Sequence, residues 1–168
     1  MNIKKIFDIS VVRNWIKFSN TQVNFDGLTS IRKNTLKAQS ISCIVVDKVY
    51  KDGSFVCVRL VIAIKGSIKQ THEFDSFNEA LEFCDIWIDI IGDDSIVEYI
   101  DKNSGKHVFF NKDGTNQIIN KKSSDGKYFN LIVLVDALDN TNNRLGFTQH
   151  VLFDTEESAD LFSNEFLV

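Results

Sequence analysis

The chain of 168 residues (19.2 kDa) is the size of one ordinary domain, or of two small lobes packed together. Hydrophobic residues make up 43% of it and charged residues 25%, so it can bury a core and wholesale disorder is excluded. Proline is absent and glycines number 8, which excludes collagen-like and Pro-rich architectures, and the formal net charge is a modest −4.

The N-terminal segment, residues 1–19, suits either a short helix capped by Ser10 or an edge strand. Its apolar residues are Val11, Val12, Trp15 and Ile16. We expect both tryptophans of the chain to lie in the core. Short strands are expected next, near residues 22–25 and 29–36.

The clearest strand covers residues 55–65, where β-branched residues are frequent and alternate side chains are aliphatic. The face predicted to be buried consists of Val56, Val58, Leu60, Ile62 and Ile64. The opposite face is mixed, so it could meet either solvent or a partner. A strand over residues 40–50 precedes it across an Asp52-Gly53 turn, and a third follows over about residues 67–74.

A helix is predicted over about residues 76–91. Ser76 and Glu79 have the spacing of a capping box, and Gly92 is well placed to end the helix. Its apolar face comprises Phe77, Ala80, Leu81, Cys84, Trp87, Ile88 and Ile91. Its other side carries the carboxylates of Glu79, Glu82, Asp85 and Asp89.

The second half repeats this order of elements. Strands are expected over residues 96–101, 106–111, 115–120, 128–138 and 144–153, with a loop at 139–143 and a final helix from Thr155. At an offset of 79 residues, Phe74-Asp75-Ser76 matches Phe153-Asp154-Thr155, while Ala80 and Phe83 match Ala159 and Phe162. We therefore predict an α+β protein of two similar antiparallel β-meander-plus-helix units, residues 1–92 and 93–168. We expect them to pack with pseudo-two-fold symmetry into one compact domain.

Charge is sorted along the chain. Residues 1–72 hold 12 Lys and Arg against 4 Asp and Glu, a balance of +8, whereas residues 73–101 hold none against 10, a balance of −10. Residues 102–135 hold 6 against 2 and residues 136–168 hold 1 against 7, which gives +4 and −6. Strand-rich stretches are therefore basic and helix-rich stretches acidic.

This sorting predicts a cationic sheet exterior. If one face of each sheet packs on helices, its Lys and Arg side chains must leave by the other face, because an unpaired buried cation is costly. The candidate residues are Lys48, Tyr50, Phe55, Arg59, Lys65, Lys127 and Tyr128. Further cations flank them at Arg32, Lys33, Lys37, Lys121 and Lys122.

Cations interleaved with aromatic rings suit single-stranded nucleic acid. Cations neutralise phosphates, and aromatic faces stack bases for about 1–3 kcal/mol each. The predicted phosphate contacts are Lys48, Arg59 and Lys65, and the predicted stacking residues are Tyr50, Phe55 and Tyr128. The simpler alternative is that exposed lysines on a sheet only protect its edges and keep the protein in solution.

The acidic helix allows a different function. The stripe of Glu79, Glu82, Asp85 and Asp89 continues into Asp93 and Asp94. Such a stripe is ordinarily a solvated helix face, but it could also dock a basic protein, as an acidic inhibitor or immunity protein does.

No pattern of residues predicts catalysis or bound cofactors. Cys43, Cys57 and Cys84 are an odd number without CxxC spacing, and His72, His107 and His150 are far apart in the sequence. We expect no metal and no cofactor, and we favour a non-enzymatic binding protein while leaving enzymatic activity open. Neither a signal peptide nor the run of about 18 uncharged residues of a membrane span is visible, so we expect a cytoplasmic protein with no membrane contact.

Two successive units of about four strands and a helix, with basic strands and acidic helices, resemble the architecture of Whirly and Pur-repeat single-stranded nucleic-acid-binding proteins. The resemblance covers about residues 20–168 and rests on topology, so no individual residue is carried over from that group. It implies two units that interlock through their helices and curved sheets that grip a nucleic-acid strand.

Overall fold

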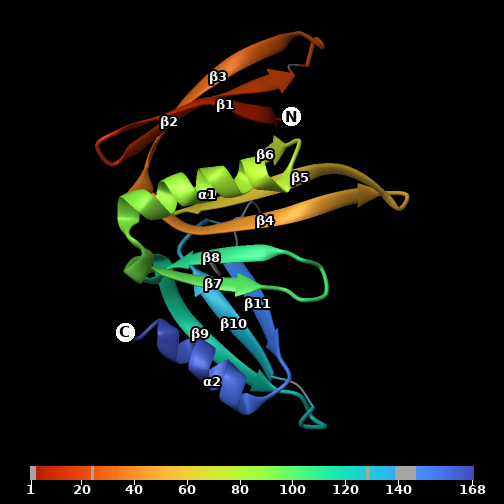
Figure 1. Ribbon diagram of the computed structural model, residues 1–168, viewed down its shortest axis with the longest axis vertical. Helices are drawn as coiled ribbons and strands as arrows, with labels where there is room; N and C mark the ends of the chain where they lie inside the picture. The colour runs from red at the N-terminus through yellow and green to blue at the C-terminus, as the bar shows by residue number, and fades with distance from the viewer. Residues whose placement is uncertain (1–2, 24, 128, 139–146) are drawn as a thin grey trace.

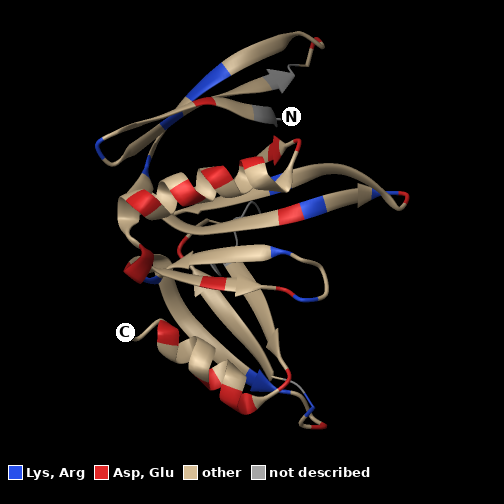
Figure 2. Cartoon of the chain, viewed as in Figure 1, with Lys and Arg blue, Asp and Glu red and all other residues tan. Residues whose placement is uncertain are grey.

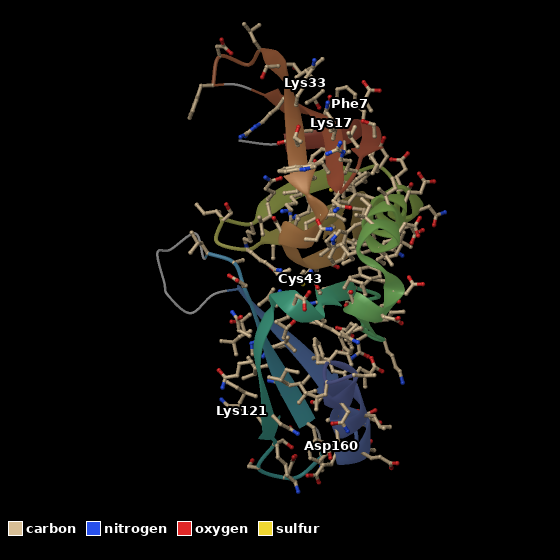
Figure 3. All side chains as sticks on the ribbon, turned by 90° about the vertical axis from the view of Figure 1, so that its left-hand side faces the viewer. Phe7, Lys17, Lys33, Cys43, Lys121 and Asp160 are labelled. Atoms are coloured by element: carbon tan, nitrogen blue, oxygen red, sulfur yellow. The ribbon has the colours of Figure 1, made fainter. Side chains whose placement is uncertain are left out.

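A computed structural model describes residues 3–23, 25–127, 129–138 and 147–168. Three antiparallel sheets follow one another along the long axis of the molecule, and the two helices α1 and α2 lie on the same side of them (Figures 1 and 3). The prediction of an α+β protein built on antiparallel sheets is confirmed.

The N-terminal sheet has the order β1-β2-β3, the central sheet β6-β5-β4-β8-β7 and the C-terminal sheet β11-β10-β9. The strands are β1 (Ile3–Val12), β2 (Trp15–Val23), β3 (Thr29–Lys37), β4 (Ile41–Lys51), β5 (Ser54–Ile64), β6 (Gln70–Phe74), β7 (Ile96–Ile100), β8 (His107–Asn111), β9 (Thr115–Lys122), β10 (Phe129–Val135) and β11 (Phe147–Phe153). The helices are α1 (Phe77–Ile91) and α2 (Glu156–Glu165), and the 3-10 turns are η1 (Ala38–Ser40), η2 (Asp93–Ser95) and η3 (Lys112–Gly114).

The first residues form a hairpin, so the helix alternative for residues 1–19 is wrong and the edge strand is correct for β1. Strands β1 and β2 pair in antiparallel order, with Val12 opposite Trp15. Along β2, Ile16, Phe18 and Asn20 are buried while the residues between them face outward, which is the period of a strand. Of the strand expected near residues 22–25, residues 22 and 23 form the end of β2, residue 24 falls outside the described residues, and Phe25 lies in a turn. Trp15 is 43% exposed, so its prediction as a core residue is wrong.

The predicted hairpin of β4 and β5 is confirmed. Asp52 and Gly53 connect the strands at φ 52° and 79°, the left-handed backbone that a tight two-residue turn of this kind requires. Val56, predicted to be buried, is 55% exposed. The strand β6 pairs with β5 only from Val58 to Ile62, so at Val56 the hairpin extends beyond the sheet as a two-stranded ribbon.

The central sheet is covered on both faces. Six consecutive residues of β4, from Ile41 to Val46, are buried. Ile44 and Val46 belong to a first core shared with α1 and the N-terminal sheet. Cys43 and Val45 belong to a second core, which includes β10 and α2. The face of the central sheet on which β5 carries its mixed residues therefore packs against the C-terminal sheet.

Both helices begin where the sequence predicts. The Ser76 hydroxyl accepts a hydrogen bond from the Glu79 backbone N–H at 3.3 Å, and Thr155 caps α2 in the same way. In α1 the fully buried residues are Ala80, Phe83, Cys84 and Trp87, so Phe83 joins the predicted face. The Trp87 indole N–H donates a hydrogen bond to the Ala38 carbonyl at 3.0 Å. This bond connects α1 to η1, the turn that joins the N-terminal sheet to the central sheet.

The strands of the second half lie close to their predicted positions. β7, β8 and β9 each begin within a residue of the prediction, and β7 and β8 extend the central sheet beyond β4. The loop predicted at 139–143, and the start of the strand predicted from 144, fall outside the described residues. In the described part, β11 begins at Phe147 and pairs with β10 in unbroken register as far as Phe153.

A close backbone contact joins the central and C-terminal sheets at Gly114. A Cβ added there would lie 2.3 Å from Ser42 Cβ and 2.5 Å from Ser42 Cα. The single proton of the Ser42 hydroxyl is shared between the carbonyls of Ala63, at 3.2 Å, and Asp136, at 2.6 Å. The Asp136 N–H in turn donates to the Gly114 carbonyl at 2.8 Å, so the joint has no room for a side chain at 114.

We predict that Gly114→Ala lowers the free energy of unfolding by about 1–3 kcal/mol, because the new methyl group would push the Ser42 backbone aside. Urea unfolding of Gly114→Ala and of the neighbouring exposed-site control Asp113→Ala measures this difference, and the control should stay within about 0.5 kcal/mol of the parent. Equal stability of the two variants would contradict the assigned close contact.

Candidate nucleic-acid interface and acidic face

The predicted site residues on β4 and β5 do not form one cationic surface. Lys48 lies opposite Val58, a residue of the first core, so it is on the α1 side of the sheet. Its ammonium nitrogen is 5.4 Å from the centre of the Phe77 ring at the start of α1. Arg59 lies on the opposite face of the sheet, because it alternates with Val58 along the same strand.

Arg59 is bordered by carboxylates. In the register of the central sheet it stands opposite Asp47 on β4 and opposite Glu73 on β6. Directly opposed residues share a face and interact, and opposite charges in such pairs attract. A phosphate approaching Arg59 would therefore meet two negative neighbours. This pairing could not be predicted from the sequence, because alternation along each strand does not determine the register between strands.

The remaining predicted residues are also separated. Tyr50 and Phe55 make an edge-to-face contact near the tip of the β4–β5 hairpin, with ring centres 6.1 Å apart. Lys65 follows β5, where its backbone N–H donates to the Ser40 carbonyl at 2.8 Å. Lys127 lies in the loop that joins β9 and β10 of the C-terminal sheet, and Tyr128 falls outside the described residues. The expected continuous wall of positive charge is thus not formed by these side chains.

A different sheet face combines cations with aromatic residues. On the outer side of β1-β2-β3, cross-strand partners form three rows: Val12, Trp15 and Lys37; then Ser10, Lys17 and Thr35; then Phe7, Ser19 and Lys33. We call these nine residues the lysine face. Figure 3 labels Phe7, Lys17 and Lys33 on this sheet at the far end of the molecule from α2.

The centre of the lysine face is hollowed. Val12, Trp15, Lys17 and Thr35 line an open groove of about 330 Å³. Trp15 lines this groove and is 43% exposed, so part of its indole ring is accessible there. Lys17 stands beside it, one alternate position along β2. The groove therefore offers a stacking surface beside a cation.

The charge of this sheet is strongly biased. Residues 3–37 contain seven Lys and Arg and two Asp, a balance of +5. One of the two, Asp8, lies on β1 in a left-handed conformation, φ 53°, where the pairing of β1 with β2 is interrupted. The sequence contained a signal for the lysine face: Trp15, Lys17 and Ser19 alternate with the buried Ile16, Phe18 and Asn20.

The acidic residues gather on another side of the molecule. Figure 2 shows acidic positions along α1, in η2, on β7 and along α2, all on the side where the helices lie. The exposed members are Glu82, Asp85, Asp89, Asp93, Asp94, Glu98, Glu156, Glu157, Asp160 and Glu165, which we call the acidic face. Glu79, the first residue of the predicted stripe, is partly buried.

The three histidines occupy separate environments. His107 Nδ1 is 3.4 Å from a carboxylate oxygen of Glu98, and the exposed His150 bonds to the Asn130 amide at 3.2 Å. His72 is buried. Within the described ranges, no three His, Cys, Asp or Glu side chains are arranged to hold a metal ion.

The cysteines are structural in character. Cys43 and Cys84 are fully buried in the two cores, and burial raises the pKa of both thiols far above its ordinary value. The pKa of the more accessible Cys57 is also raised, chiefly by burial and then by the nearby Glu73. A raised pKa leaves little thiolate at neutral pH, so none of these positions favours nucleophilic chemistry.

A chain of hydrogen bonds surrounds His72. The Asn34 amide donates to Asn20 Oδ1 at 3.1 Å, and Asn20 Nδ2 lies 3.3 Å from His72 Nδ1. His72 Nε2 lies 3.2 Å from Gln70 Oε1. Since Asn20 Nδ2 can only donate, Nδ1 accepts and the proton of the neutral ring sits on Nε2, which donates to Gln70. Burial, assisted by the charge of Arg32, lowers the pKa of His72 to about 4.

Comparison with protein families, with curated proteins and with solved structures finds no match to this chain. The described helices also include none that is long and apolar enough to span a bilayer. The chemistry of the surfaces must therefore support any functional conclusion by itself.

We predict that His72 makes folding sensitive to mild acid. The folded protein resists protonation of His72 down to about pH 4, whereas the unfolded chain takes up the proton near pH 6.5. The contribution of neutral His72 to the free energy of unfolding is therefore fully present above pH 6.5. About 2–3 kcal/mol of it is lost as the pH falls from 7 to 4.5.

Urea unfolding at these two pH values tests this prediction. His72→Gln should remove this part of the pH dependence, whereas the exposed-site control His150→Gln should retain it. Parallel pH dependence in the parent and in His72→Gln would show that His72 is not held neutral.

Proposed function

We propose that the protein binds single-stranded nucleic acid on the lysine face of the N-terminal sheet. The observation that carries the proposal is the three cross-strand rows, which bring Lys17, Lys33 and Lys37 to one face with Trp15 next to Lys17 and Lys37. Ammonium groups neutralise phosphates, and an exposed indole stacks on a base of any sequence. The interface is thus of the predicted kind but lies on a different sheet.

The other open side of the molecule is less suited to a polyanion. The acidic face would repel phosphates, and the second face of the central sheet is occupied by β10 and α2. A strand of nucleic acid would accordingly lie across the lysine face of the N-terminal sheet, at one end of the long axis of the molecule. The resemblance to Whirly and Pur-repeat proteins agrees with a sheet-borne interface of this type.

We also infer that the two halves arose by duplication, with residues 1–92 and 93–168 as the units. Each half has a strand hairpin, a 3-10 turn (η1 or η3), three consecutive strands that form a sheet segment, and a helix. The caps Ser76 and Thr155 make equivalent hydrogen bonds 79 positions apart. The strand number differs, however, because six strands precede α1 and five lie between α1 and α2 in the described part of the chain.

We predict micromolar or tighter binding of a fluorescein-labelled 20-mer of thymidylate at 50 mM salt, measured by anisotropy. With about three or four phosphate contacts, affinity should fall roughly 10- to 50-fold between 50 and 200 mM salt. Binding should also quench Trp15 fluorescence, while Trp87, which is fully buried, should respond little.

The variants make the test specific to the lysine face. Lys17→Gln combined with Lys33→Gln should flatten the salt dependence, and Trp15→Ala should cost about 1–3 kcal/mol of binding energy. The matched double control, Lys121→Gln with Lys122→Gln on β9, removes the same charge from another sheet. No binding at 50 mM salt, or equal losses in the two double variants, would reject the proposed interface.

A second function is favoured by the acidic face, which could bind and neutralise a basic protein. Residues 73–101 contain ten Asp and Glu and no Lys or Arg, and α2 adds further carboxylates on the same side. Complementary charge of this kind accelerates association and selects partners.

For this second function we predict salt-sensitive binding of a labelled decalysine peptide. Asp85→Lys combined with Asp89→Lys should weaken it at least tenfold, because both side chains are exposed on α1. The distant reversal Glu156→Lys with Glu157→Lys should have a smaller effect if α1 is the centre of the surface. Insensitivity of peptide binding to reversal at Asp85 and Asp89 would remove α1 from this function.

A further inference from the structure

A polar cavity of about 270 Å³ lies between the inner side of β2 and β3 and the start of β6. Arg32, Lys69 and Thr71 line it together with the members of the hydrogen-bond chain that runs from Asn34 to Gln70. Every described residue that lines the cavity is polar, and none is Asp or Glu. A hollow of this composition beside an apolar core indicates a polar ligand.

The hydrogen-bond chain determines which polar atoms of the cavity wall donate and which accept. Asn20 and His72 are 0% and 1% exposed, so their orientation is held by the surrounding core. The direction of donation runs from Asn34 through Asn20 and His72 to Gln70 Oε1. The carboxamide oxygen of Gln70 thus serves as an acceptor within the chain, and its NH₂ group is the donor at the end.

The charged side chains that line the cavity are basic. Arg32 stands opposite Asn20 in the register of β2 and β3, on the inner side of the sheet, and Lys69 adds a second cation. His72 contributes no charge near neutral pH because its pKa is lowered to about 4. The wall of the cavity therefore combines a guanidinium group and an ammonium group with amide and hydroxyl groups.

We propose that this cavity is a binding site for a phosphate group. A phosphate monoanion or dianion matches the two cations in charge, and its oxygens can accept from a guanidinium, an ammonium, an amide and a hydroxyl at once. The phosphate could be the free ion or an ester on a nucleotide. The inference does not rest on the lysine face, because residues on a strand alternate between its two sides.

Titration with inorganic phosphate at pH 7, followed in ¹H–¹⁵N spectra, tests the site. Saturable chemical-shift changes should appear for the side-chain amide of Gln70 and for the imidazole nitrogens of His72, whose ring should keep its proton on Nε2. Sodium chloride at matched ionic strength should not move these resonances. Arg32→Gln and Lys69→Gln should each weaken phosphate binding about tenfold or more.

Lys33→Gln is the matched control, because it removes a neighbouring cation from the other side of β3. It should keep phosphate binding and weaken only the oligonucleotide, which separates this inference from the proposed function. A nucleoside 5′-monophosphate that binds where the nucleoside does not would assign an esterified phosphate, and binding of the inorganic ion alone would assign the free one. Equal responses to chloride and phosphate, or unchanged affinity in Arg32→Gln, would overturn the proposal.

Discussion

Successive side chains of β4 enter two different cores. Ile44 and Val46 pack with α1 and the N-terminal sheet, while Cys43 and Val45 pack with β10 and α2. Burying one such aliphatic side chain stabilises the fold by about 1.5–3 kcal/mol, and a shift of one residue would send every side chain to the wrong core. The position of β4 therefore fixes the register of β5 and β8 beside it, and through them the placement of both helices.

Burial of the central sheet on both faces also decides where charge can emerge. Over the buried half of β4 and β5 neither face is open to water, so the charged positions of these strands begin only at Asp47 and Arg59, toward the hairpin tip. There the cations separate to opposite faces, and Arg59 acquires carboxylate neighbours from both adjacent strands. The N-terminal sheet is different. Its inner side packs on the first core and its outer side is uncovered, so the lysines of β2 and β3 can share one open surface.

Local signals in the sequence predicted the elements well, and their limits are physical. The Asp52-Gly53 turn, the Ser76 cap and the alternation of β5 from Val58 to Ile62 depend on neighbouring residues, and the structure confirms each of them. Which residues face one another depends on strand register and on sheets joined across long stretches of sequence. That is why Lys48 and Arg59 were expected together, and why Trp15, which the hairpin places at the end of a sheet, was expected in the core.

The net charge of −4 describes neither the lysine face nor the acidic face of this protein. At physiological ionic strength the field of an exposed charge falls off over about 8 Å, so a ligand responds to the side chains near it and not to the sum over the chain. The lysine face lies on the N-terminal sheet, while the acidic face follows both helices down the side of the molecule. A polyanion at one and a basic protein at the other would each meet a locally favourable field. Sorting of charge between strands and helices, visible along the sequence, thus becomes a sorting between surfaces only because the helices lie together on one side of the sheets.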